Sequence, residues 1–140
     1  MKNNATIRVK SQRKLDDESI ELVTGGAFYE KNGSWYILYE EKEEMGMANC
    51  NVMIKINDDG VIVTRKGDFS SKMVYKKGEA TEFLYHMPYG TLPIILETRD
   101  IQWSVDESDA ELIMTYFLSV NEENDENILK IKVISDIPND

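Results

Sequence analysis

The residues whose side chains could take part in a reaction are few, and the first to consider is His86, the sole histidine of the chain. It lies two residues before Pro88, near the predicted end of a strand, where an imidazole could act as a general base. No nucleophile or orienting group is near it in the sequence, so a packed or surface histidine is the favoured interpretation. We predict no catalytic residue.

Cys50, the sole cysteine, alternates with Ala48 and Val52 on the apolar face of a predicted strand. A thiol in such a place serves as a small apolar side chain. A packed, structural cysteine is therefore favoured over a reactive one, and the chain can form no internal disulfide.

Metal and cofactor sites are poorly supported. One histidine and one cysteine argue against a transition-metal site, because such metals usually take several of these ligands. Carboxylates cluster at 40–44, 106–109 and 122–126. A weak calcium site at 121–126 is an alternative, but the ordered alternation and the glycine of an EF-hand loop are missing, so solubilising loop tips are favoured. We also find no phosphate-binding loop and no nucleophile elbow, and we predict neither a metal nor a cofactor.

Binding of a small, partly apolar molecule is the chemistry that the aromatic residues favour. The predicted ligand-binding residues, in the interior or at the mouth of a barrel, are Tyr29, Tyr36, Tyr39, Arg65, Tyr85, His86 and Tyr116. An adaptable apolar pocket could also use Met45, Met47, Met53, Met73, Met87, Met114, Trp35 and Trp103. Ordinary core filling is the favoured interpretation of this second set.

The elements that must position these side chains are strands. From Glu79 to Val105, two alternating segments flank a break at Pro88 and Gly90. Proline cannot donate a ladder hydrogen bond and glycine tolerates a positive φ, so we expect pairing to stop and the chain to reverse there. Alternation recurs along the chain in segments near 5–10, 20–29, 34–41, 48–56, 61–65, 69–75, 81–87, 92–105, 112–120 and 129–133.

Short turn signals join these segments. Asn32 and Gly33 predict a tight hairpin, and Gly25 with Gly26 predicts a bulge or sharp bend in the second strand. The turn at 58–60 leaves two alternatives. A three-residue loop would pair Ile56 with Ile62 and point Arg65 outward, whereas a two-residue loop would point Arg65 inward.

The fold class that follows is all-β, a closed antiparallel up-and-down meander barrel of about 8–10 strands. Hairpin-length connections favour a meander, and the glycine interruptions favour closure. We expect a single domain over residues 1–140. A barrel of this strand number is either filled by side chains or wide enough for one small ligand, as in lipocalins.

The chain also resembles a known family. Tyr85, Met87, Tyr89 and Gly90, followed by a strand reaching Thr98 and Ile101, are similar to the YwiB-like family of uncharacterised bacterial proteins. Further agreeing features are the stretch with Gly26, Tyr29, Asn32, Tyr36, Tyr39, Glu40 and Glu41, and Arg65 with Gly67 after a tight turn. The resemblance implies a calycin-type, lipocalin-like barrel in a cytoplasmic protein. It implies no reaction, ligand or catalytic residue.

Composition limits the partners. The chain has 16 basic and 26 acidic residues, a net charge of −10, which repels nucleic-acid phosphates and anionic lipids. The first ten residues lack the apolar run of a signal peptide, and no stretch approaches the roughly 18 apolar residues that span a bilayer. We expect a soluble cytoplasmic protein without nucleic-acid or membrane partners.

Three functions remain open at this stage. The leading hypothesis is a non-enzymatic barrel that binds a small apolar ligand inside. The second is a protein-interaction module or homodimer with an exposed aromatic and methionine surface, the choice between monomer and homodimer being left open. The third is an enzyme, such as a hydrolase with two carboxylates at the barrel mouth and His86 or Tyr89.

Overall fold

The computed structural model describes residues 3–14, 17–45 and 48–136 of the chain. Its strands are β1 (Ala5–Arg13), β2 (Glu18–Lys31), β3 (Ser34–Glu41), β4 (Cys50–Asn57), β5 (Gly60–Gly67), β6 (Ser71–Tyr75), β7 (Ala80–Met87), β8 (Gly90–Val105), β9 (Asp109–Val120) and β10 (Glu123–Ser135), with one 3-10 helix, η1 (Glu43–Met45). In this part of the chain, no helix combines the length and the apolar character needed to cross a membrane.

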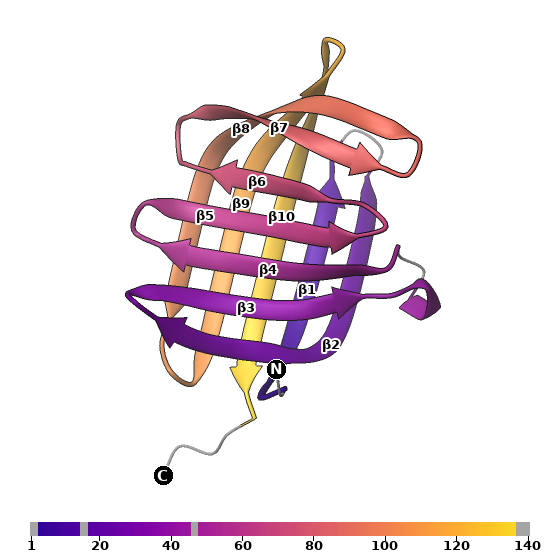
Figure 1. Cartoon of the computed structure of the whole chain (residues 1–140). Coiled ribbons are helices and arrows are strands. Elements are labelled where there is room, and N and C mark those ends of the chain that lie inside the picture. Colours follow the sequence, from indigo (N-terminus) through magenta and orange to yellow (C-terminus); the bar gives the residue numbers. More distant parts are fainter. Residues whose placement is uncertain (1–2, 15–16, 46–47, 137–140) are drawn as a thin grey trace.

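The strands form one antiparallel sheet in the order β6-β5-β4-β3-β2-β1-β10-β9-β8-β7. Each strand pairs with its neighbour in sequence, except that β1 pairs with β10 and β6 is not laddered to β7. The sheet curls until β6 and β7 meet, which makes a nearly closed barrel. Figure 1 shows β3–β6 crossing in front of β8–β10 at a steep angle. The predicted up-and-down meander is confirmed.

The bend in β2 lies where its glycines predicted it. Residues Glu18 to Gly26 pair with β1, and Ala27 to Lys31 pair with β3, so the strand passes from one wall of the barrel to the other between Gly26 and Ala27. A Cβ atom on Gly26 would lie 2.3 Å from the Leu38 carbonyl oxygen and 2.2 Å from Ile7 Cδ1. Only glycine lets the two walls approach this closely.

Side chains fill the middle of the barrel. Alternate residues of every wall point inward, and the largest fully buried ones include Ile7, Ile37, Ile54, Leu96, Leu112, Met114 and Ile131. Met73 is also buried, while Met53 lies on the outer side of β4, between buried Val52 and Ile54. Met47 and the side chain of Met45 lie outside the described residues. The interior is therefore mainly a packed core, as expected for small barrels.

The turn between β4 and β5 settles the direction of Arg65. Asn57 pairs with Gly60 and Ile56 with Val61, so the loop contains two residues, Asp58 and Asp59. Arg65 then shares the parity of the buried Val61 and Val63 and points inward. The two-residue alternative is the one observed.

The two end strands of the sheet meet at a seam. The isolated bridge between Ser70 and His86 joins them at one end, with N–H···O distances of 2.9 and 2.8 Å. Near the other end, the Thr81 hydroxyl donates to the Val74 carbonyl oxygen at 2.9 Å. The wall between β6 and β7 is thus fastened at its ends rather than along its length.

Candidate functional site

A cavity of about 180 Å³ lies inside the barrel, toward one end. Its lining residues are Val9, Ser11, Ile20, Leu22, Glu41, Val63, Arg65, Met73, Tyr75, Tyr116 and Leu129. Aliphatic side chains make most of the wall, and the charged and hydroxyl groups are contributed by β1, β3, β5, β6 and β9. An apolar chamber with a few convergent polar groups is the usual form of a small-molecule site.

The charged pair of this cavity is Arg65 and Glu41. Arg65 Nε donates to Glu41 Oε1 at 3.3 Å, and the two side chains are 27% and 13% exposed. Arg65 Nη1 lies 3.9 Å from Met73 Sδ. Burial opposes the positive charge and is the largest single influence, but attraction by Glu41, Tyr39 and Tyr75 together with the hydrogen bond to Glu41 outweighs it and raises the pKa of Arg65 above its ordinary value. The guanidinium is therefore charged at every physiological pH.

Glu41 holds only one edge of the guanidinium. Among the described residues, no side-chain hydrogen bond uses Arg65 Nη2. Because an arginine has five N–H donors, Nη2 can donate to a further anionic or carbonyl group.

Three tyrosines surround this pair. The Tyr75 and Tyr116 rings are edge-to-face with centroids 5.0 Å apart, and the Tyr75 hydroxyl donates to Met73 Sδ at 3.7 Å. Burial raises the pKa of Tyr39 to about 12 and raises the pKa values of Tyr75 and Tyr116 as well. Their hydroxyl groups stay protonated at neutral pH and can donate hydrogen bonds.

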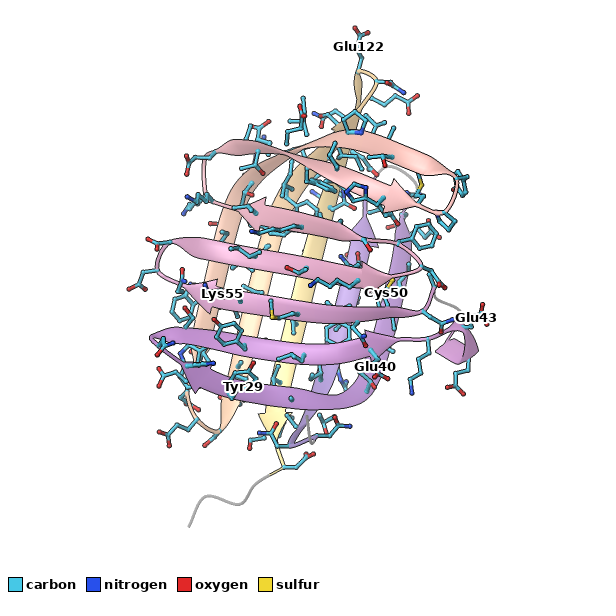
Figure 2. The ribbon with its side chains drawn as sticks, viewed as in Figure 1. Tyr29, Glu40, Glu43, Cys50, Lys55 and Glu122 are labelled. Atoms are coloured by element: carbon cyan, nitrogen blue, oxygen red, sulfur yellow. The ribbon has the colours of Figure 1, made fainter. Side chains whose placement is uncertain are left out.

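Two further ion pairs lie at the end of the barrel beside Tyr116. Arg13 Nε lies 3.4 Å from Asp125 Oδ2, and Lys14 Nζ lies 3.1 Å from Glu126 Oε2. These contacts tie the β1–β2 hairpin to the base of the β9–β10 hairpin, whose tip carries Glu122 (Figure 2). Within the described part of the chain, Asp125 Oδ1 is buried and has no hydrogen-bond partner.

The structure brings together three of the predicted ligand-binding residues. Tyr39, Arg65 and Tyr116 point inward and converge at the polar end of the barrel. Tyr85 shares the inward parity of Phe83, is half-buried, and lies against Phe69 with ring centroids 5.6 Å apart. The binding role of all four stays a prediction.

Tyr29, Tyr36 and His86 do not line the interior, which corrects the predicted placement. Tyr29 and Tyr36 alternate with buried Phe28 and Ile37 and stack on each other outside the barrel, 5.2 Å apart. Figure 2 shows Tyr29 and Lys55 on the outer side of this wall. His86 is exposed, and its Nδ1 lies 3.1 Å from the Thr91 hydroxyl. Strand alternation decides these positions, since each residue has a buried neighbour that takes the inward face.

Sequence reasoning missed Glu41 and Tyr75. Glu41 follows Trp35, Ile37 and Tyr39 on the same face of β3, but its acidic neighbours made it look like part of a solvated loop. Tyr75 lies two residues after Met73 and shares its buried face of β6. In both cases strand parity was the signal that could have identified an inward side chain.

A groove of about 920 Å³ lies on the outer surface over β3–β7. It is lined by Tyr36, Met53, Lys55, Ile62, Thr64, Arg65, Lys66, Ser70, Ser71, Lys72, Phe83, Leu84 and His86. Four of these side chains are cationic and none is a carboxylate, in a chain whose net charge is −10. Arg65 borders both this groove and the internal cavity.

The sole histidine and the sole cysteine lie on opposite sides of the barrel wall. Cys50 is buried and its Sγ lies 3.4 Å from the Phe69 carbonyl oxygen, whereas His86 is on the outer surface. Among the described residues, no three histidine, cysteine or acidic side chains are grouped so that they could hold a metal ion.

Comparison with known proteins agrees with this architecture. The sequence model of a family described as "Domain of unknown function (DUF1934)" matches residues 6–131. A relative from Bacillus subtilis (strain 168), the "Uncharacterized beta-barrel protein YwiB", is 29% identical over 122 residues, which cover 86% of this chain and 84% of the relative. The crystal structure of the ywiB protein from Bacillus subtilis superposes with a TM-score of 0.86 at 25% identity, covering 95% of this chain and 92% of that one. The predicted resemblance to the YwiB-like family is confirmed.

Proposed function

This chain belongs to the DUF1934 family, whose relative YwiB is described as an uncharacterised β-barrel protein, so we propose a function from the geometry of the chain itself. We propose that it binds one small, partly apolar molecule inside the barrel without catalysing a reaction. The observation that carries the proposal is the cavity of about 180 Å³ with Arg65 at its polar end. The ligand's polar group lies beside Arg65 and its apolar part lies among the aliphatic side chains.

The size of the cavity limits the ligand. A buried apolar cavity of about 150 Å³ is enough to bind benzene. The ligand is therefore a molecule of a few non-hydrogen atoms, much smaller than the retinoids or long acyl chains that wide barrels hold.

The placement of the reactive side chains supports binding without catalysis. His86 and Cys50 are separated by the barrel wall, and the protonated tyrosines and the paired Arg65 can donate hydrogen bonds but do not form a nucleophile with its base. The absence of nucleic-acid and membrane partners, and a location in the cytoplasm, stay predictions that rest on charge and composition.

The test uses a cavity-filling variant and a matched control. Ser11 points into the cavity, and its neighbour Lys10 is exposed on the outer face of β1. We expect pentanamide, a small molecule with a polar head and an apolar chain, to shift the amide NMR signals of cavity residues in the wild type and in Lys10→Phe. Ser11→Phe fills the chamber and should abolish those shifts. Equal shifts in both variants, or none in the wild type, would rule out binding in this cavity.

A second candidate function is contact with another protein or a second copy of the chain. It is favoured by the outer stack of Tyr29 on Tyr36, with Lys55 Nζ 6.0 Å from the Tyr36 ring centroid and Met53 beside them. Native mass spectrometry of freshly purified protein tests both candidates at once, because it reports retained small molecules and subunit count. A monomer at all concentrations would argue against the homodimer.

A further inference from the structure

We propose that the molecule bound in the cavity is a small monocarboxylate with a short apolar chain, and that it enters sideways through the seam between β6 and β7. This inference rests on the proposed function and adds to it the charge of the ligand and its route. Three features of the structure lead to it: the seam, the depth of the outer groove, and the charges that line that groove.

The seam is the discontinuity in the wall. Every other pair of adjacent strands is joined by a ladder, that of β8 and β9 with one irregularity at Thr98 and Asp100, whereas among the described residues β6 and β7 are joined by the Ser70–His86 bridge and the bond from Thr81 to Val74 alone. Between these two fastenings, around Lys72 and Phe83, the described residues show no backbone hydrogen bond across the seam. Opening the wall here breaks far fewer hydrogen bonds than opening any ladder, so a lateral route through the seam requires the least free energy.

The outer groove lies over this seam and is lined by residues from both faces of the wall. Its lining includes Lys72 and Leu84, whose side chains face outward, and also Ser71 and Phe83, which have inward parity. Arg65, an inward residue of β5, lines both the groove and the internal cavity. Groove and cavity therefore share Arg65 as a lining residue.

The charges of the groove select an anion. Lys55, Lys66 and Lys72 join Arg65 in its lining, which contains no carboxylate. In a molecule of net charge −10 this is a local reversal of sign that attracts a small anion and speeds its association. At the bottom, Glu41 holds Arg65 Nε and Met73 Sδ lies 3.9 Å from Nη1, which leaves Nη2 to donate to the ligand carboxylate.

A route through the end of the barrel is the competing one. Ile20, which lines the cavity, is 50% exposed near this end, while Arg13 and Asp125 close the part beside β10. Both routes lead to the same chamber, so affinity does not distinguish them. Rates do.

The first experiment tests the charge of the ligand. Pentanoate and pentanamide have nearly the same shape and differ in charge, and we expect pentanoate to bind at least tenfold more tightly by NMR titration. Arg65→Met should remove this preference while leaving pentanamide binding within about threefold. Equal affinities in the wild type would overturn the carboxylate assignment. No binding of either molecule would instead contradict the proposed function itself.

The second experiment tests the route by fastening the seam. Ser70 and His86 are a hydrogen-bonded antiparallel pair, for which Cα atoms lie about 5.5 Å apart, within the roughly 4.4–6.8 Å that a disulfide spans. We would prepare Ser70→Cys with His86→Cys in a Cys50→Ser background. Oxidation should slow pentanoate association and dissociation at least tenfold, with unchanged affinity, and reduction should restore both rates. The rates follow from relaxation dispersion.

Controls separate the possible outcomes. Ile20→Trp narrows the barrel end and should leave the rates unchanged. Lys72→Gln should slow association at low salt, whereas Lys130→Gln, an equal charge change on the outer face of β10, should not. Binding with rates that are insensitive to the disulfide but slowed by Ile20→Trp would overturn the sideways route and leave the cavity as the binding site.

Discussion

Arg65 Nε lies 3.3 Å from Glu41 Oε1, so an ion pair joins β5 to β3 across the inner face of β4. Both side chains point into a barrel whose middle is filled by aliphatic residues. A charge in such surroundings is costly unless it is paired. The pair therefore allows a positively charged group to lie at the end of an apolar chamber, with its Nε held by Glu41.

Removing the charge of Glu41 should destabilise the protein. Glu41→Gln leaves Arg65 without its counter-charge in a mostly buried position, and we expect the free energy of unfolding to fall by about 1–3 kcal/mol in urea denaturation. Glu40→Gln is the matched control. Glu40 is exposed and lies 3.4 Å from Lys42 Nζ, so its loss should change stability by less than about 0.5 kcal/mol. Equal effects at the two positions would show that the buried Arg65–Glu41 pair contributes no more to stability than an exposed ion pair.

Stability should fall at alkaline pH, partly because of Tyr39. Burial raises the pKa of Tyr39 from 10.0 in the unfolded chain to about 12 in the fold. Below pH 10 the phenol is neutral in both states, and its contribution is fully present. Between pH 10 and 12 only the unfolded state loses the proton, so stability decreases by about 1.4 kcal/mol per pH unit for this group. Denaturation of Tyr39→Phe over this range should show a shallower decrease. A parallel decrease in both proteins would contradict the assignment.

The same substitution should be costly at Gly26 and tolerated at Gly25. In Gly26→Ala the new methyl group would lie 2.3 Å from the Leu38 carbonyl oxygen, a backbone atom that cannot move alone, and we expect a loss of about 2–4 kcal/mol. In Gly25→Ala the nearest atom is Asn3 Nδ2 at 3.1 Å, on an exposed side chain that can move. That variant should lie within about 0.5 kcal/mol of the wild type by thermal denaturation. A tolerated Gly26→Ala would mean that the two walls are not in close contact at this bend.

Thr98 offers a gain in stability. Its side chain is buried, with 1% exposure, and in the described part of the chain its Oγ1 has no hydrogen-bond partner. Thr98→Val keeps the shape and removes the unpaired hydroxyl, which should stabilise the fold by about 1 kcal/mol. Thr81→Val is the opposite case, because it removes the 2.9 Å bond to Val74, and it should be destabilising. Urea denaturation of the two variants would reject this account if both changes had the same sign.

Most of the barrel was predictable because strand alternation and turn residues act locally. The inward positions of β4, the tight turn at Asn32 and Gly33, and the bend at Gly25 and Gly26 follow from patterns a few residues long. Asn32 and Gly33 indeed have φ values of 53° and 81°. Closure followed from the number of strands and their short connections.

The site was harder to predict because it depends on where strands from distant parts of the chain place their ends. The direction of Arg65 depended on one residue more or less in a turn, which composition does not decide. Tyr29 and Tyr36 were expected inside because they are aromatic, but their neighbours Phe28 and Ile37 occupy the inner face. The cavity itself is a difference between the volume of the barrel and that of its side chains, which no single segment contains.

The pairing of β1 with β10 affects how the protein is made. Their register runs from Ala5 with Ser135 to Arg13 with Asn127, so β1 is completed by a strand that is synthesised after the other eight. Until β10 emerges, the free edge of β1 is exposed on the nascent chain and can pair wrongly with other chains. The barrel therefore closes only once β10 has been synthesised, and slow translation of the segments before β10 would prolong the time during which the edge of β1 is exposed.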